Sequence, residues 1–436
     1  MHTTTSPRRA TARAAAAVLV AIALVAVACG SSGSNDSSAA GSGGSTAAST
    51  GGDAAADHPA YEDAGPYVPG VTTLDLDGRK VEVWYPADQG AEAGKAKDVF
   101  RISTLLPDNL KSVVPDDIDP RYETDAYRDI TASTAGPFPV VLFSHGYAGY
   151  PTLYAFLLTH LASWGFVVVA PDHVERGLLA AVTQCTKVAD DAAVLLAARD
   201  LAVQESNDPA SVLKGTIDPT RVATVGHSAG AAAAVKTAKD PSVATFVALD
   251  GGGSGGASSA TTPTTDAGGC LQQSTATTTS DSGGSGGSTT TTAFDGSSLP
   301  DKPGMLITGG NDQVIPLARL QPFYDAMAAP KRLVVIDGAG HNSVTDICLI
   351  GADQGGLLKI AAKVGISVPD TVSRLFDDGC DEAGGYPAVK QVWEVPRHFV
   401  VAQLRWVFGI DPEPVGLGPA IADAFPPLKL GYTSTD

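Results

Sequence analysis

The stretch RVATVGHSAGAAAA, residues 221–234, decides the fold, because the pattern changes sharply at the single serine inside it, Ser228. Before this serine the residues read as a strand, and after it they read as a helix of small residues. The pattern G-x-S-x-G also occurs at 252–256 and 283–287, but both copies lie in low-complexity sequence without a flanking strand or helix. Only Ser228 therefore has the strand–turn–helix context of a serine nucleophile.

The residues around Ser228 are those that a nucleophile on a strand-to-helix turn requires. A nucleophile on a tight strand-to-helix turn adopts a strained backbone that exposes its hydroxyl. Gly226 and Gly230 fit this turn, since neighbouring backbone there comes too close for a Cβ. Two backbone N–H groups must bind the developing oxyanion. We expect them to come from Ala229, at the helix N-terminus, and from Tyr147, in the glycine-containing loop SHGYAG.

Strand and helix patterns alternate on both sides of this turn. Continuous apolar strands followed by segments of helical spacing predict an α/β fold, with a mainly parallel sheet and helices on both faces. A hairpin around Asp77-Gly78 adds a leading antiparallel edge, and the polar residues 88–136 read as irregular. The predicted strands are 138–146, 166–170, 222–225, 244–249, 305–308 and 333–336, and the predicted helices are 153–164, 189–205, 229–238, 317–327 and 399–408.

Two further side chains complete a candidate set for nucleophilic catalysis. His341 directly follows the last predicted strand, and an imidazole can take the proton of the serine hydroxyl. Asp312, just past the preceding strand, is the predicted acid that steadies the imidazolium. Asp250, one strand earlier, is the rival acid. The carboxyl ends of parallel strands meet at one edge of the sheet, and the chain order Ser228, Asp312, His341 suits this arrangement.

The remaining histidines compete less well for the role of base. His227 adjoins Ser228 but is expected to point away at the turn. His145 and His173 follow earlier strands and are candidates for lining the site. His160 and His398 fall on predicted helices.

The first 29 residues read as a targeting segment. Three arginines precede an apolar run that is too short for a comfortable membrane span and ends in small residues before Cys29. LVAVAC followed by glycine resembles a bacterial lipobox, which predicts a lipidated Cys29 on an exported, outward-facing protein. The alternative is ordinary secretory cleavage near the same place. Residues 30–57, rich in Ser, Gly and Ala, predict a flexible tether.

The rest of the chain, 58–436, is long enough for one substantial core, interrupted by a low-complexity insertion at 251–299. Besides Cys29 there are four cysteines, and export favours two disulfides among them. Three connectivities are open. Proximity in sequence and in the predicted topology favours Cys348–Cys380 together with Cys185–Cys270.

The composition limits the partners of the protein. The net charge is −18, which argues against nucleic acid and against electrostatic docking to anionic lipid headgroups. A lipid anchor is then the expected route to a membrane. The cysteine and histidine spacing suggests no metal, and we expect no cofactor.

Five stretches together resemble the α/β-hydrolase superfamily from about residue 71 to 408: LFSHGYAG, LASWGFVVVAPDH, IDPTRVATVGHSAG, LITGGNDQVIP and VVIDGAGHNSVTD. Within it the chain is similar to the group of cutinases and polyester hydrolases, platelet-activating-factor acetylhydrolases, and chlorophyllase-like and dienelactone-hydrolase-like proteins. The resemblance implies Ser228 as nucleophile, Asp312 as acid, His341 as base, and the amides of Tyr147 and Ala229 as oxyanion donors. It implies a serine esterase acting on small-molecule or lipid esters.

The resemblance is not complete. Polyester hydrolases carry a tryptophan just after the strand where this chain has Asp250 followed by glycines. The acetylhydrolases place their acid after that same strand, which keeps Asp250 as an alternative. An acyltransferase using the same three side chains, and a non-catalytic surface lipoprotein with a hydrolase scaffold, are the other functions that this sequence allows.

Overall fold

The structure is a computed structural model, which describes residues 59–105, 111–112, 114–182, 185–253, 298–368 and 370–436. The predicted targeting segment with Cys29 and the tether lie outside these described residues. So does most of the insertion, with Cys270. The interpretations that rest on them stay predictions.

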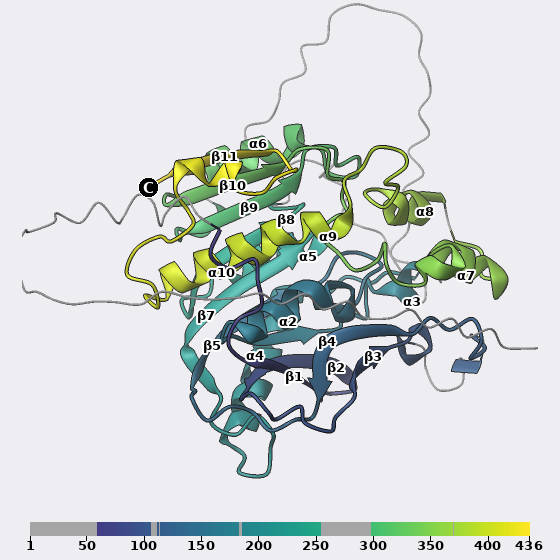
Figure 1. The fold of residues 1–436 in the computed structure, drawn as a ribbon, viewed down its shortest axis with the longest axis horizontal. Coiled ribbons are helices and arrows are strands. Elements are labelled where there is room, and N and C mark those ends of the chain that lie inside the picture. Colours follow the sequence, from purple (N-terminus) through teal and green to yellow (C-terminus); the bar gives the residue numbers. More distant parts are fainter. Residues whose placement is uncertain (1–58, 106–110, 113, 183–184, 254–297, 369) are drawn as a thin grey trace, which may run out of the picture. The chain divides into compact units, whose positions relative to one another are not determined.

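The described residues form one sheet of eleven strands (Figure 1). Neighbouring strands from β6 through β5, β7, β8 and β9 to β10 pair in parallel, while β1 and β2 form an antiparallel hairpin that joins this block through β6. The order across the sheet is β11-β10-β9-β8-β7-β5-β6-β2-β1-β4-β3. The strands are β1 Val68–Leu76, β2 Arg79–Ala87, β3 Lys97–Phe100, β4 Tyr122–Arg128, β5 Phe138–Ser144, β6 Val167–Pro171, β7 Ile217–His227, β8 Val243–Leu249, β9 Gly304–Gly309, β10 Lys331–Ile336 and β11 Leu430–Thr435.

Helices cover both faces of the sheet (Figure 1). On one face α2 packs against α10, and on the other α4 packs against α5, with α6 on the same side. Shorter helices lie in the long connection between β10 and α10. The helices are α2 Ala155–Ser163, α3 Leu178–Val182, α4 Asp191–Asn207, α5 Ala229–Thr237, α6 Leu317–Ala326, α7 Leu357–Lys363, α8 Asp370–Asp377, α9 Val389–Val392 and α10 Glu394–Val407.

Alternation along the central strands divides the core into two layers. In β5 every residue is buried. Val141 and Phe143 join the apolar cluster beneath α2 and α10, whereas Val140 and Leu142 join the cluster beneath α4 and α5. Since successive side chains of a strand point to opposite faces, one uninterrupted apolar run supplies both layers. The predicted fold class, a mainly parallel sheet with a leading antiparallel hairpin, is confirmed.

Two predictions about the edges of the sheet are wrong. The segment 88–136 contains β3 and β4, and His341 does not follow the last strand, because β11 pairs antiparallel with β10. Each of these strands mixes polar with apolar residues, and all three lie at or near the two edges of the sheet. An edge strand buries less apolar surface than a central one, and its sequence therefore carries a weaker signal.

The long connection after β10 is fastened back on itself. A disulfide joins Cys348 to Cys380 and confirms one of the two predicted pairs. The other pair includes Cys270, outside the described residues, and stays a prediction. No helix in the described part of the chain combines the length and apolarity needed to cross a membrane.

Candidate active site

The turn between β7 and α5 places Ser228 in a strained conformation. Its φ is +56°, in the left-handed region that a serine rarely adopts. The flanking glycines make the turn possible. A Cβ on Gly226 would lie 2.1 Å from the carbonyl oxygen of Gly230, and one on Gly230 would lie 2.0 Å from that of Ser144. The strained turn thus presents the Ser228 hydroxyl at the carboxyl edge of the sheet.

The three side chains predicted to act together lie within hydrogen-bonding reach. The His341 Nε2 is 2.9 Å from the Ser228 Oγ, and its Nδ1 is 2.8 Å from the Asp312 Oδ2. All three residues are buried. An ionised Asp312 can only accept, so the imidazole carries its proton on Nδ1 and leaves Nε2 free to accept from Ser228. This is the geometry that a serine nucleophile and its base require.

The backbone holds the carboxylate of Asp312 in place. Its Oδ1 accepts the N–H groups of Val314 and Ile315, each at 2.7 Å, so that Oδ2 faces the imidazole. The N–H of Asn311 donates to the carbonyl of Ala339 at 2.8 Å, which ties the loop after β9 to the loop after β10. The acid and the base are therefore positioned by the same pair of loops.

Asp250 does not reach His341. It follows β8, its Oδ1 accepts the N–H of Gly309 at 2.6 Å, and its Oδ2 lies 3.9 Å from the Nε2 of His227. Among the described residues this second oxygen has no hydrogen-bond partner. Burial, and next the nearby charge of Asp312, raise the pKa of Asp250 well above its usual value. The geometry thus distinguishes the carboxyl group of Asp312, which faces the imidazole, from that of Asp250, which does not.

The prediction that His227 points away from the site is wrong. Its ring packs beside that of His341, with centroids 4.7 Å apart, and its Nε2–H donates to the His341 carbonyl at 2.9 Å. Its Nδ1 then accepts from the hydroxyl of Tyr154 at 2.9 Å, and that hydroxyl accepts the N–H of Gly146 at 3.0 Å. Burial lowers the pKa of His227, in keeping with a neutral ring. The chain of bonds connects the loop after β5 to the backbone of His341.

The loop after β5 passes directly over Ser228. A Cβ on Gly146 would lie 3.3 Å from the Cβ of Ser228. Tyr147 and Ala229 flank this point, and neither backbone N–H donates a hydrogen bond to another group in the part of the chain that the structure describes. Both predicted oxyanion donors are therefore available, and their roles stay predictions.

A narrow cleft opens at Ser228. It holds about 320 Å³ of space, part of it open to solvent. Leu375 and Phe376 of α8 and Ile347 supply an apolar wall, and Ser228 is only 9% exposed. The Asn342 side chain donates to the carbonyl of Leu375 and ties α8 to the loop of His341.

A larger hollow lies elsewhere, beside β1 to β4, with about 790 Å³ of space. Two of its carboxyl groups pair with one arginine. Arg128 bonds to Asp98 at 2.8 Å and contacts Glu82 at 3.3 Å. The residues that line it include no hydroxyl paired with a histidine, so the narrower cleft is the better candidate for catalysis.

In a second group of serine, histidine and aspartate, the serine and the histidine are sealed from solvent. The Ser144 Oγ is 2.9 Å from the His173 Nε2, and the His173 Nδ1 is 3.2 Å from the Asp191 Oδ1. Ser144 and His173 are completely buried, and neither His145 nor His173 lines the cleft. The prediction that these two histidines line the site is therefore wrong, and this second group cannot meet a substrate.

Sequence reasoning missed Tyr154, Arg176 and the apolar wall of α8. Tyr154 and Arg176 act on backbone groups of the loop after β5, and the sequence gives no sign of such contacts. Within the described residues, no group of three or more His, Cys, Asp or Glu side chains is placed to hold a metal ion.

Residues 127–251 match the family model of chlorophyllase, an esterase-type hydrolase family with a mostly parallel α/β sheet. The match spans β5 to β8 and includes Tyr147, Ser228 and Asp250, but it ends before Asp312 and His341. A search of curated proteins found no match. The sheet and this match are consistent with the α/β-hydrolase superfamily and agree with a serine esterase-like hydrolase at a coarse level.

Replacing Asp250 with Asn should change how stability depends on pH. Because the folded pKa of Asp250 is raised, the folded state binds more protons than the unfolded state above pH 4 or so, and stability falls as pH rises. Asn removes this loss while its amide oxygen can still accept from Gly309. We therefore expect the free energy of unfolding of Asp250→Asn, relative to that of the wild type, to be higher at pH 7 than at pH 4. Urea unfolding followed by circular dichroism measures it. The same dependence of unfolding free energy on pH in the two proteins would contradict the raised pKa.

Proposed function

We propose, on the premise that the chain is an α/β-hydrolase, that the protein is an exported serine carboxylic ester hydrolase that forms an acyl-enzyme on Ser228. The observation that carries the proposal is the unbroken contact from the Ser228 Oγ through the His341 imidazole to the Asp312 carboxylate. The family match over the nucleophile segment supports the same chemistry. Small-molecule or lipid esters are the substrate class.

The reaction proceeds in two halves. The His341 Nε2 takes the proton of Ser228 as Oγ attacks the ester carbonyl carbon, and Asp312 stabilises the imidazolium. The oxyanion accepts hydrogen bonds from the backbone N–H groups of Tyr147 and Ala229. His341 then gives its proton to the departing alcohol, and the C–O bond breaks. In the second half His341 deprotonates water, which attacks the acyl-enzyme and releases the acid and the Ser228 hydroxyl.

The proposal of export has two grounds. The Cys348–Cys380 disulfide is compatible with an oxidising compartment outside the cytoplasm. The targeting segment and lipidation at Cys29 rest on sequence alone. In this proposal the lipid anchor is the contact with the membrane, and the substrate reaches the cleft from outside the cell.

Fluorophosphonate labelling tests the nucleophile. The wild-type protein should hydrolyse p-nitrophenyl butyrate and carry the label on the peptide that contains Ser228. Ser228→Ala should lose the label and at least about 10⁴-fold in kcat. Peptide mapping by mass spectrometry separates this outcome from labelling of the buried Ser144. Labelling of Ser228→Ala at wild-type level would refute the proposal.

A matched pair of substitutions tests the acid. Asp312→Asn should lower kcat by about 10³- to 10⁴-fold, because the amide cannot stabilise the imidazolium and favours the wrong tautomer. Asp250→Asn should stay within about threefold of the wild type, since the carboxyl that it replaces is already neutral. Steady-state hydrolysis of p-nitrophenyl butyrate measures both. The opposite ranking would make Asp250 the acid.

The apolar wall predicts a preference for short acyl chains. The narrow cleft leaves little room beside Phe376, so p-nitrophenyl acetate and butyrate should exceed the octanoate in kcat/KM by about tenfold or more. Phe376→Ala should reduce that ratio by opening the wall. Val372→Ala is the control, because Val372 is buried on the same helix but does not line the cleft. A wild-type preference for octanoate would contradict this interpretation.

A further inference from the structure

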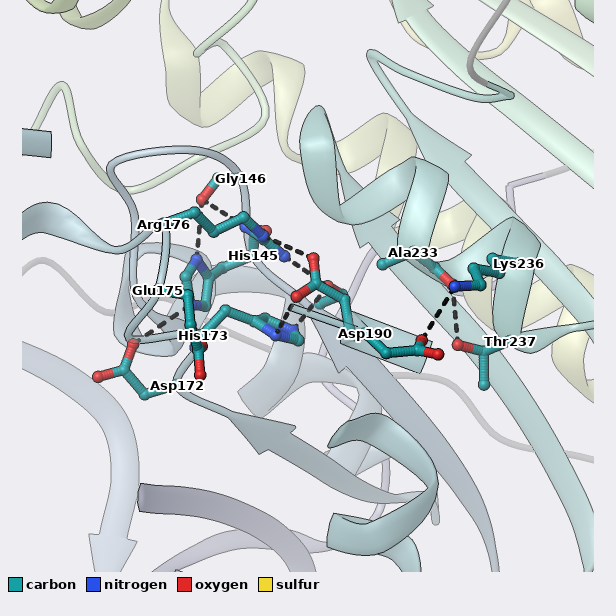
Figure 2. Close-up of polar contacts among 12 residues, drawn as sticks. His145, Gly146, Asp172, His173, Glu175, Arg176, Asp190, Ala233, Lys236 and Thr237 are labelled. Carbon is teal, nitrogen blue, oxygen red and sulfur yellow. Dashed lines mark hydrogen bonds and ion pairs between the residues drawn. The ribbon is translucent and has the colours of Figure 1, made fainter. Parts of the chain in front are cut away.

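A buried cluster of polar side chains lies behind the loop that passes over Ser228 (Figure 2). At its centre is Arg176, on the segment after β6, which is 8% exposed. Its Nε donates to the Asp191 Oδ2 at 2.8 Å, and its Nη2 donates to the Ser144 Oγ at 3.0 Å. Its Nη1 donates to the carbonyl oxygens of His145 and Gly146, the latter at 2.9 Å. One guanidinium thus fastens two consecutive carbonyls of this loop to the first turn of α4.

The carbonyl oxygen of Gly146 accepts two more hydrogen bonds. The Nδ1–H of His145 donates to it at 2.8 Å, and the N–H of Gly149 at 3.2 Å. His145 can donate from Nδ1 because its Nε2 accepts the N–H of His173 at 2.8 Å, which requires a neutral ring. Burial also lowers the pKa of His145 and favours that form. Three donors on one side therefore fix the direction of this carbonyl.

The orientation of the Gly146 carbonyl also fixes the direction of the Tyr147 N–H, because both belong to one planar peptide group. The bond between Gly146 and Tyr147 is trans, and in a trans peptide the C=O and the N–H point to opposite sides of the chain. With the Gly146 carbonyl held toward Arg176, the Tyr147 N–H points to the side away from it. Gly146 and Tyr147 both line the cleft at Ser228, and this N–H has no other acceptor among the described residues. The bonds behind the loop thus aim a donor into the cleft.

The charge of Arg176 adds to this effect. Hydrogen bonds to a carbonyl polarise the conjugated peptide group, which makes its N–H a stronger donor, and a charged donor does so more than a neutral one. Asp191 compensates the buried charge. Although burial alone would raise the pKa of Asp191, its contacts with His173 and Arg176 hold that pKa below the usual range. The contact with Asp191 thereby holds the guanidinium in one orientation.

We propose that Arg176, supported by His145, is a positioning residue that sets the direction and the donor strength of the Tyr147 N–H in the oxyanion hole. It acts through the backbone and does not touch the substrate. The inference rests on the proposed function, because it concerns the transition state of the ester hydrolysis at Ser228.

Arg176→Met tests the inference, with Arg79→Met as the matched control. Arg79 holds the same segment, through the Asp172 carbonyl and Glu175, but contacts neither His145 nor Gly146. With p-nitrophenyl butyrate, Arg176→Met should lose about 10- to 100-fold in kcat, less than the loss of a whole oxyanion donor, while KM changes less than threefold. Arg79→Met should keep kcat within threefold. Rates are expressed per active site titrated with a fluorophosphonate, which removes the effect of unfolded protein.

A tetrahedral inhibitor separates positioning from a merely structural role. Phenylboronic acid forms an adduct with a serine hydroxyl that places an oxygen in the oxyanion hole, so its affinity should fall in Arg176→Met by about the same factor as kcat. Arg176→Lys, which keeps the charge on a single donor nitrogen, should be intermediate and serves if the Met variant does not fold. Two outcomes would overturn the inference. One is a kcat per site equal to that of the wild type, and the other is a rise in KM by the same factor as the loss of boronate affinity. A wild-type protein without ester turnover would instead overturn the proposed function.

Discussion

The close approach of Gly230 to the end of β5 is the constraint on which the rest of the site depends. The missing Cβ lets the first turn of α5 come against the carbonyl of Ser144, where a Cβ would lie only 2.0 Å away. This approach forces the turn at Ser228 to be tight and brings the nucleophile under the loop that begins at His145. The strained φ of Ser228 and the position of the loop over it are therefore two consequences of one packing requirement.

From that point, hydrogen bonds rather than apolar packing connect the loops at the edge of the sheet. The path from Gly146 through Tyr154 and His227 to the His341 carbonyl ties the loop after β5 to the loop after β10. Backbone bonds tie the latter to the loop of Asp312. Each buried polar group on this path has a partner, and an unpaired one would cost about 1–3 kcal/mol. The arrangement is thus resistant to local rearrangement even though its members come from separate parts of the chain.

The sequence was informative where a residue type has one physical explanation. Ser228, with glycines on both sides and a strand-to-helix change of period, has few structural roles besides a nucleophile's, and Asp312 and His341 follow apolar strands whose ends must meet. It was uninformative where the function of a side chain depends on backbone at a distance. Arg176 and Tyr154 read as ordinary surface and core residues, because the carbonyl and amide that they contact belong to another segment. The edge strands β3, β4 and β11 were missed for a different reason, since they mix polar with apolar residues and lack the continuous apolar run of a central strand.

The two aspartates at the site, Asp312 and Asp250, differ in their role because their surroundings differ. The carboxyl group of Asp312 accepts hydrogen bonds from two backbone N–H groups and from the imidazole. Asp250 receives one backbone N–H and lies close to the charge of Asp312, so the raised pKa leaves it neutral. The negative charge of Asp312 disfavours the ionisation of Asp250, because two like charges close together repel. A neutral Asp250 instead fills the space after β8, bonds to the end of β9 through Gly309, and leaves a single negative charge facing the base.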